Sequence, residues 1–264
     1  MKNIFFLSGI ARSGSTLLGS ILNQNPEIFV SPTSPLMDLF CVTEMDYNKL
    51  DLQYTFDKDQ SLASLHKSLA NIFYSHVDKP YIIDKHRGWP KNIDQIKKTM
   101  ADDPKIICTY RPVAENIVSF LKLINNDPNN SVDKQLRSKG LECNTYNRAM
   151  MLWYNYSSDP YESLKYGLEH YRKHLLIVNY DDIIEDTENQ LARIYTFLDI
   201  PQYQHTFDNI HNTCAEKKDD MWGFNDLHVI RNTLNKTSDD PKQVLGKHLY
   251  EFFTNFDREL KLLD

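Results

Sequence analysis

Near the N-terminus, a short apolar run leads into a loop with the glycine spacing of a phosphate-binding loop. Gly9 and Gly14 are separated by four residues, and the hydroxyl residues Ser15 and Thr16 follow at once. Backbone N–H groups in such a loop, together with the positive end of the following helix, form a binding site for an anion. Ser15 stands where a nucleotide phosphate loop has its lysine. Arg12, inside the loop, is the cation available to replace it.

Several groups in the loop could donate hydrogen bonds to phosphate oxygens. Arg12 adds a charge-assisted donor to the N–H groups and hydroxyls of the neighbouring residues, which are Ser13, Gly14, Ser15 and Thr16. The alternative is a Gly/Ser turn that merely caps a helix. The missing lysine argues against ATP. Asp84 ends one predicted strand, but no apolar run ends in an acidic residue that clearly indicates a Mg²⁺ anchor, so no metal site is predicted.

A second polar cluster, Asp84-Lys85-His86, follows the apolar run Tyr81-Ile82-Ile83. Histidine has an ordinary pKa of about 6.5, so its imidazole can act as a general base at neutral pH. A neighbouring lysine can stabilise charge that develops on a bridging or leaving oxygen. The alternative is that Lys85 and His86 are solvated loop residues.

A third cluster combines Arg111, Ser119 and Tyr180. Arg111 follows an apolar run over 105–110, and Ser119 lies two turns into the helix that comes next. Both could contact one phosphate near the start of that helix, or they could be a surface arginine and a small packing residue. Tyr180 ends the last predicted strand. It could stack on or hydrogen-bond an adenine, or it could simply pack.

Strands alternate with helices along the chain. Apolar runs predict strands at residues 5–7, 27–30, 81–83, 105–110 and 175–180. A helical period predicts helices over 16–23, 61–76, 91–100, 113–124, 146–156, 160–171, 187–198 and 248–263, whereas 125–140 is predicted to be a polar surface loop. This order predicts an α/β fold, a three-layer sandwich with a central, mostly parallel sheet and a strand–phosphate loop–helix unit at the N-terminus. Ligands bind such sheets at the carboxyl ends of the strands, where all the polar clusters converge.

Composition limits the class of protein. The chain has 264 residues, of which 41% are hydrophobic and 25% charged, as in ordinary folded proteins. A net charge of −6 argues against nucleic-acid binding across the surface. No apolar run approaches the ~20 residues of a membrane span, and the N-terminal run is too short for a signal peptide. The four cysteines are far apart and have no metal-ligand spacing. They fit free thiols in a reducing compartment, so we expect a cytoplasmic protein.

Taken together, the motifs resemble those of the sulfotransferases that use PAPS (3′-phosphoadenosine 5′-phosphosulfate). The loop Gly9-Ile10-Ala11-Arg12-Ser13-Gly14-Ser15-Thr16 resembles their 5′-phosphosulfate loop. The segment Tyr110-Arg111-Pro112 through Ser119-Phe120 resembles their 3′-phosphate motif. Val178-Asn179-Tyr180-Asp181-Asp182-Ile183, followed by Thr196-Phe197-Leu198 and Pro201, is similar to a third family segment. The blocks keep the family's order over residues 4 to about 201.

The resemblance implies a single sulfotransferase domain over residues 1–264 and a role for each motif. Arg12 would contact the phosphosulfate, and the 5′-phosphate would be bound by Ser13, Gly14, Ser15 and Thr16. The 3′-phosphate would be bound by Arg111 and Ser119, and Tyr180 would lie at the adenine. A basic C-terminal segment closes over the 3′-phosphate in the family, and its counterpart here would be Arg231 or Lys236.

The resemblance also implies a reaction. Protein-tyrosine sulfotransferases have a glutamate base after the first helix, where this chain has Ser31-Pro32-Thr33-Ser34. Small-molecule sulfotransferases instead have lysine and histidine after a later strand, as in Asp84-Lys85-His86. His86 would then deprotonate an acceptor hydroxyl, on a small molecule or a peptide. Lys85 would stabilise the bridging oxygen as adenosine 3′,5′-bisphosphate leaves, without a metal.

Two other functions remain open from the sequence. The first is a small-molecule or nucleotide kinase with a degenerate phosphate loop, which would need ATP and Mg²⁺. The second is a nucleotide-binding module without catalytic activity, which would bind a ligand without transferring a group.

Overall fold

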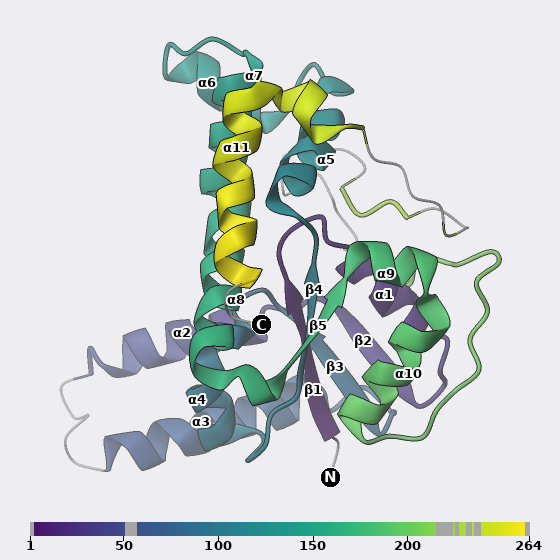
Figure 1. The fold of residues 1–264 in the computed structure, drawn as a ribbon. Coiled ribbons are helices and arrows are strands. Elements are labelled where there is room, and N and C mark those ends of the chain that lie inside the picture. Colours follow the sequence, from purple (N-terminus) through teal and green to yellow (C-terminus); the bar gives the residue numbers. More distant parts are fainter. Residues whose placement is uncertain are drawn as a thin grey trace.

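The centre of the molecule is one parallel sheet. A computed structural model describes residues 3–50, 57–214, 224, 227–230, 234 and 239–261. The sheet has five strands in the order β2-β3-β1-β4-β5, and all of its neighbouring pairs are parallel. Its members are β1 (Asn3–Gly9), β2 (Ile28–Thr33), β3 (Tyr81–Lys85), β4 (Ile106–Tyr110) and β5 (Leu175–Asn179). Figure 1 shows helices on both sides of this sheet, which confirms the predicted α/β sandwich.

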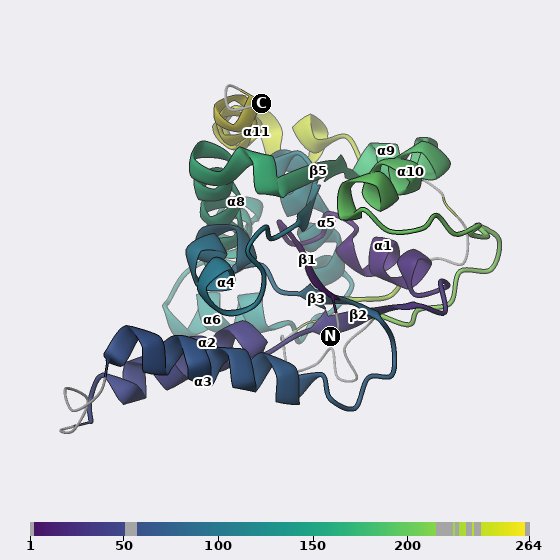
Figure 2. The ribbon, with the colours of Figure 1, turned by 90° about the horizontal axis from the view of Figure 1, so that it is seen from below.

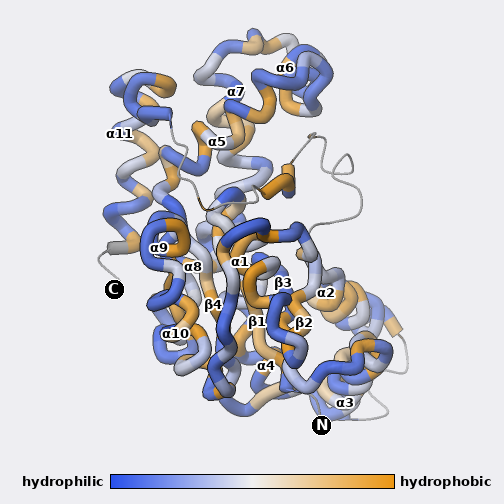
Figure 3. The backbone as a smooth tube through the Cα atoms, turned by 90° about the vertical axis from the view of Figure 1, so that its right-hand side faces the viewer, coloured by the Kyte–Doolittle hydropathy of each residue, from blue (hydrophilic) through white to orange (hydrophobic). Residues whose placement is uncertain are grey.

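The strands are apolar on both faces, so other elements must pack against each face of the sheet. Side chains alternate between the two faces of a strand. Accordingly, Phe6 and Ile106 belong to one hydrophobic cluster, whereas Leu7 and Ile107 belong to the other. Figure 3 shows the hydrophobic colour running through the central strands. Runs without a polar alternation are typical of a parallel sheet buried on both faces.

The two faces carry different sets of helices (Figure 2). The smaller cluster is closed by α1 (Ser15–Leu22), α9 (Tyr180–Glu185) and α10 (Thr187–Leu198). The larger cluster receives side chains from α2 (Leu36–Tyr47), α3 (Lys58–Phe73), α4 (Ile93–Thr99), α5 (Val113–Asn125), α6 (Ser131–Ser138), α7 (Thr145–Leu152), α8 (Ser158–Tyr171) and α11 (Pro241–Lys261). Short 3₁₀ turns lie at Trp89–Asn92 and Arg172–His174, and a π-helix at Trp153–Ser157 joins α7 to α8.

Three of these helices, α2, α6 and α9, lie where the sequence predicts none, and at α9 the chain turns helical at Tyr180, where a strand was predicted to end. The predicted polar loop over 125–140 is wrong, because α6 forms within it. Asn130 caps this helix by accepting a hydrogen bond from the Asp133 N–H, and Val132 and Leu136 are buried four residues apart. No helix is predicted at α2, where Phe40 is buried on the inner face while much of the helix is exposed. A cap and one buried pair were enough to overcome the polar composition of 125–140.

The strand ends bring the predicted polar clusters to one edge of the sheet. Leu7 on β1 pairs with Lys85 at the end of β3. Gly9 at the end of β1 pairs with Thr109, two residues before Arg111. The phosphate loop after β1 therefore emerges between the clusters that follow β3 and β4.

Gly9 lies against the backbone of β4. Its φ of 133° is a conformation that side chains disfavour, and a Cβ built on it would lie 2.1 Å from the Thr109 carbonyl oxygen. Because backbone blocks that space, no residue with a side chain fits without moving one strand.

We expect Gly9→Ala to reduce the free energy of unfolding by about 4 kcal/mol or more, through steric overlap and strain. The matched control is Gly140→Ala. Gly140 also has a positive φ, 69°, but a Cβ there would meet nothing within 4 Å. It should therefore cost only about 1 kcal/mol of backbone strain. Urea unfolding of both variants measures the difference, and equal losses would contradict the close-approach argument.

Candidate functional site

The loop between β1 and α1 has two residues with left-handed backbone conformations. Arg12 and Gly14 both have left-handed backbone conformations, with φ of 59° and 87°. Gly14 is the N-cap of α1, and the first N–H groups of a helix have no partner within the helix itself. Alternating backbone conformations of this kind turn N–H groups toward one concave site. The backbone of this loop is therefore compatible with the predicted phosphate-binding role.

Within this loop, Ser13 has a structural hydroxyl. Its side chain is fully buried, and its Oγ donates to the Ile10 carbonyl at 2.6 Å while lying 2.6 Å from the Thr109 Oγ1. These contacts fasten the loop to the end of β4. Ser13 would therefore reach an anion through its backbone N–H, whereas Ser15 and Thr16 line the cavity with their side chains.

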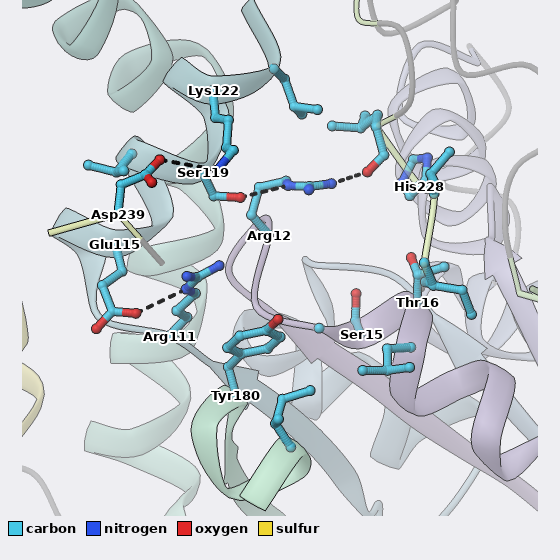
Figure 4. Close-up of a pocket in the computed structure, with 18 of the residues that line it drawn as sticks. Arg12, Ser15, Thr16, Arg111, Glu115, Ser119, Lys122, Tyr180, His228 and Asp239 are labelled. Atoms are coloured by element: carbon cyan, nitrogen blue, oxygen red, sulfur yellow. Dashed lines mark hydrogen bonds and ion pairs between the residues drawn. The ribbon is translucent and has the colours of Figure 1, made fainter. Parts of the chain in front are cut away.

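Arg12 links the loop to two other parts of the chain. Its Nε donates to the Ser119 Oγ at 3.3 Å, and its guanidinium also donates to the Leu227 carbonyl (Figure 4). Arg12 and Ser119 were predicted from separate motifs, 107 residues apart, and the fold brings them into contact.

Arg111 and Tyr180 form the other half of the cavity. The Arg111 side chain is 7% exposed, and its Nε donates to the Glu115 carboxylate at 3.2 Å. The guanidinium carbon lies 4.5 Å from the centre of the Tyr180 ring, a cation–π contact. On the side of the loop, a Cβ at Gly14 would lie 2.8 Å from the same ring. Tyr180 therefore lies between the phosphate loop and Arg111. It begins α9, one residue past the end of β5.

These residues line one open cavity, together with others that the sequence analysis did not predict. Lys122 lies on α5 one turn after Ser119 and pairs with Asp239 at 3.2 Å. His228, on a segment that is distant in sequence, also lines the cavity. Lys122 had a readable signal, since residues three apart on a helix share a face. His228 had none, because its segment has no periodic pattern.

A smaller cleft adjoins this cavity at the end of β3. Its lining includes Lys85 and His86, and it shares Ser15, Arg87 and His228 with the larger cavity. The catalytic residues predicted after β3 therefore lie next to the predicted nucleotide site.

Lys85 reaches across to the phosphate loop from the neighbouring strand. The residue is 5% exposed, and its ammonium donates to the Cys214 carbonyl at 3.2 Å and to the Thr16 hydroxyl at 3.5 Å. A cation held at the first turn of α1 can stabilise negative charge bound there. This position supplies, from β3, the type of charge that the loop itself lacks at Ser15.

His86 is held from both sides of its ring. The Gly88 N–H, which can only donate, lies 3.1 Å from Nδ1, so the proton of the neutral ring is on Nε2. Nε2 faces the Asp38 carboxylate at 3.6 Å. Burial lowers the pKa of His86, and Asp38 opposes that shift while Arg87 and Lys91 add to it. The lowered pKa of His86 favours the neutral form of its imidazole.

Asp38 is the residue that sequence reasoning missed at this position. The segment Ser31–Ser34, which aligns with the glutamate base of protein-tyrosine sulfotransferases, has no carboxylate. Asp38 lies in the first turn of α2, the helix that was not predicted, and its side chain is 70% exposed. A helix starting after Pro35 turns this carboxylate toward the end of β3.

Beneath His86, a buried carboxylate fixes the turn after β3. Asp84 is fully buried and accepts hydrogen bonds from the Tyr74 hydroxyl at 2.5 Å and the Trp89 indole at 2.8 Å. Burial raises its pKa. The Trp89 ring in turn lies edge-on to His86, with centroids 6.3 Å apart. Asp84 therefore belongs to the frame of the site, not to its cavity.

Some predictions concern features that lie elsewhere. Arg231 and Lys236, the predicted C-terminal cations, fall outside the described residues. In the parts of the chain that are described, no group of three His, Cys, Asp or Glu side chains is arranged to hold a metal ion. None of the helices seen in those same parts combines the length and apolar character needed to cross a membrane.

Comparison with known families identifies the class of protein. A family model described as "Sulfotransferase family" matches residues 5–205. That match covers more than half of the chain and includes every motif at the site except the C-terminal segment. The chain belongs to the sulfotransferase family. A search of curated protein sequences finds no match.

Solved structures show the same fold at low sequence identity. A sulfotransferase from Alicyclobacillus acidocaldarius is 15% identical, with a TM-score of 0.55 over 100% of this chain and 95% of that one. The sulfotransferase domain of the Synechococcus PCC 7002 olefin synthase is 17% identical, with a TM-score of 0.52 over 100% and 94%. A sulfotransferase domain from the curacin biosynthetic pathway is 18% identical, with a TM-score of 0.51 over 77% and 76%.

Proposed function

We propose that this chain transfers a sulfuryl group from PAPS to an acceptor hydroxyl. The observation that supports the proposal is that one cavity is lined by two clusters of groups that can donate hydrogen bonds to an anion. The phosphate loop with Arg12 forms one cluster, and Arg111 with Ser119 forms the other, with Tyr180 between them. PAPS has a 5′-phosphosulfate and a separate 3′-phosphate on one adenosine, and so requires two such clusters.

The residues of the cavity fit that donor. The N–H groups of the loop and the side chains of Ser15 and Thr16 would hold the 5′-phosphate, with Ser13 and Gly14 contributing backbone. Arg111 and Ser119 would hold the 3′-phosphate, and Lys122 adds a cation one turn further along α5. The Tyr180 ring, which lines the cavity, would pack against the adenine. The Glu115 carboxylate accepts a hydrogen bond from the Arg111 Nε at 3.2 Å. This contact keeps the Arg111 guanidinium directed into the cavity.

The smaller cleft is where we place the acceptor. When bound, PAPS supplies a sulfur atom linked to the 5′-phosphate through a bridging oxygen. The acceptor oxygen forms a new bond to sulfur as the bond from sulfur to the bridging oxygen breaks. Arg12 and Lys85 stabilise the negative charge that moves onto that oxygen, and the product is adenosine 3′,5′-bisphosphate.

The acceptor proton passes to the pair formed by His86 and Asp38. Acceptance at the His86 Nε2 requires the ring proton to move to Nδ1, away from its present arrangement with the Gly88 N–H. Acceptance by the Asp38 carboxylate requires no such change. We therefore favour a shared role, in which the His86 ring, which lines the cleft, orients the Asp38 carboxylate and that carboxylate takes the proton.

Replacing Arg111 with alanine tests the donor assignment. Loss of a charge-assisted contact with the 3′-phosphate should weaken binding of adenosine 3′,5′-bisphosphate by about 10- to 100-fold. The affinity for adenosine 5′-monophosphate should change much less. Isothermal titration calorimetry measures both. Arg193→Ala, on α10 away from the cavity, is the control and should change neither. An equal loss for the two nucleotides would contradict the assignment.

Replacing the members of the proposed base pair tests the proton transfer. His86→Ala and Asp38→Asn should each lower kcat by about 10² or more while leaving nucleotide affinity near that of the unchanged protein. Single-turnover assays with labelled PAPS and a panel of hydroxyl compounds measure this. Glu44→Gln, a carboxylate further along α2, is the matched control. A variant with near-normal kcat would remove the substituted residue from the pair.

A further inference from the structure

Asn116 connects the two halves of the nucleotide cavity from beneath. It lies on α5 between Arg111 and Ser119, and its side chain is fully buried. Its Nδ2 donates to the backbone carbonyl of Ala11, and its Oδ1 accepts from the Ser157 hydroxyl at 2.8 Å. We propose that Asn116, held by Ser157, fixes the separation of the two anion sites and so determines the selectivity for a nucleotide with two separate anionic groups. The inference rests on the function proposed above.

The chemistry of the partners fixes the orientation of the Asn116 amide. The Ala11 carbonyl can only accept a hydrogen bond, so the NH₂ group must face it. The amide oxygen is then left for the Ser157 hydroxyl, which donates. Both ends of one buried side chain are therefore occupied by groups from different parts of the fold. A buried polar group satisfied in this way resists movement, because any shift leaves a donor or acceptor without a partner.

The contact with Ala11 orients the peptide unit that joins Ala11 to Arg12 in the loop. A peptide unit is planar, with its C=O and N–H pointing in opposite directions. Holding the Ala11 carbonyl therefore also fixes the direction of the Arg12 N–H. Arg12 is the loop residue with φ of 59°, and its side chain contacts Ser119, three residues after Asn116 on the same helix. The loop is thus tied to α5 by a backbone contact and by a side-chain contact.

The contact with Ser157 involves a π-helix, a rare type of helical turn. Ser157 is the last residue of the π-helix Trp153–Ser157, and it is 1% exposed. The wider π turn shifts the residues after it relative to an unbroken α-helix, and such turns are frequent at functional sites. Here the shift places a hydroxyl against the Asn116 amide, 41 residues away in sequence.

This arrangement has a specific consequence for binding. A nucleotide with a single 5′-phosphate needs only the loop, whereas one with 3′- and 5′-phosphates needs the loop and α5 at a set distance. Loosening the connection between them should therefore weaken binding of the second kind of nucleotide more than the first. A purely structural residue would instead lower stability without changing the ratio of the two affinities.

The experiment measures the affinities of the full chain for adenosine 3′,5′-bisphosphate and adenosine 5′-monophosphate by calorimetry, together with thermal unfolding. Asn116→Ala should reduce the ratio of the two affinities by about tenfold. Ser157→Ala keeps the asparagine but removes one of its partners, so it should reduce the ratio in the same direction and by less. This second variant keeps the test valid if Asn116→Ala does not fold.

Asn130→Ala is the matched control. Asn130 is also a buried asparagine whose amide is occupied at both ends, by the carbonyls of Ile124 and Asp127 and by the Asp133 N–H. Its loss should lower the unfolding temperature while the affinity ratio stays unchanged.

The outcomes separate this inference from the function on which it rests. If the unchanged protein binds both nucleotides equally, the proposed function fails and the inference with it. If the unchanged protein prefers the bisphosphate, and Asn116→Ala and Ser157→Ala keep that preference, the inference alone is overturned. A reduced ratio in these variants, with the Asn130→Ala ratio unchanged, supports it.

Discussion

The whole site depends on how closely the end of β1 approaches the end of β4. Gly9 lies against the backbone of Thr109 with no space for a side chain, and the Ser13 hydroxyl meets the Thr109 hydroxyl just beyond. These contacts hold the phosphate loop beside the turn that carries Arg111. The residues after β1 and those after β4 therefore line one cavity. In the proposed function, that cavity would hold the two ends of a single nucleotide.

Two cations of this cavity are paired with carboxylates, Arg111 with Glu115 and Lys122 with Asp239. Arg12 has neutral partners, the Ser119 hydroxyl and the Leu227 carbonyl. For Arg111, whose side chain is 7% exposed, the carboxylate lowers the cost of burying the cation and fixes the direction of its donor group. In the proposed function, a phosphate would meet donors that are already oriented, which would reduce the entropy lost on binding. The acidic net charge of the chain is compatible with this local excess of cations.

The sequence was sufficient to predict the parallel sheet and the strand–loop–helix unit at its N-terminus, because strand-length apolar runs and glycine spacing are local signals. It could not reveal Asp38, whose role depends on a helix with few buried residues. Nor could it reveal Asn116, since an asparagine inside an apolar helical period has no local signal of its partners. Ala11 and Ser157 become its neighbours only because the fold brings the phosphate loop and the π-helix Trp153–Ser157 against α5.

The most direct test of the central claim is the affinity of the unchanged protein for adenosine 3′,5′-bisphosphate compared with ADP, measured by calorimetry without added divalent metal. Both ligands carry two phosphates, but only the first carries one at each end of the ribose. The account predicts that the 3′,5′-bisphosphate binds at least tenfold more tightly. Equal affinities, or tighter binding of ADP, would contradict it.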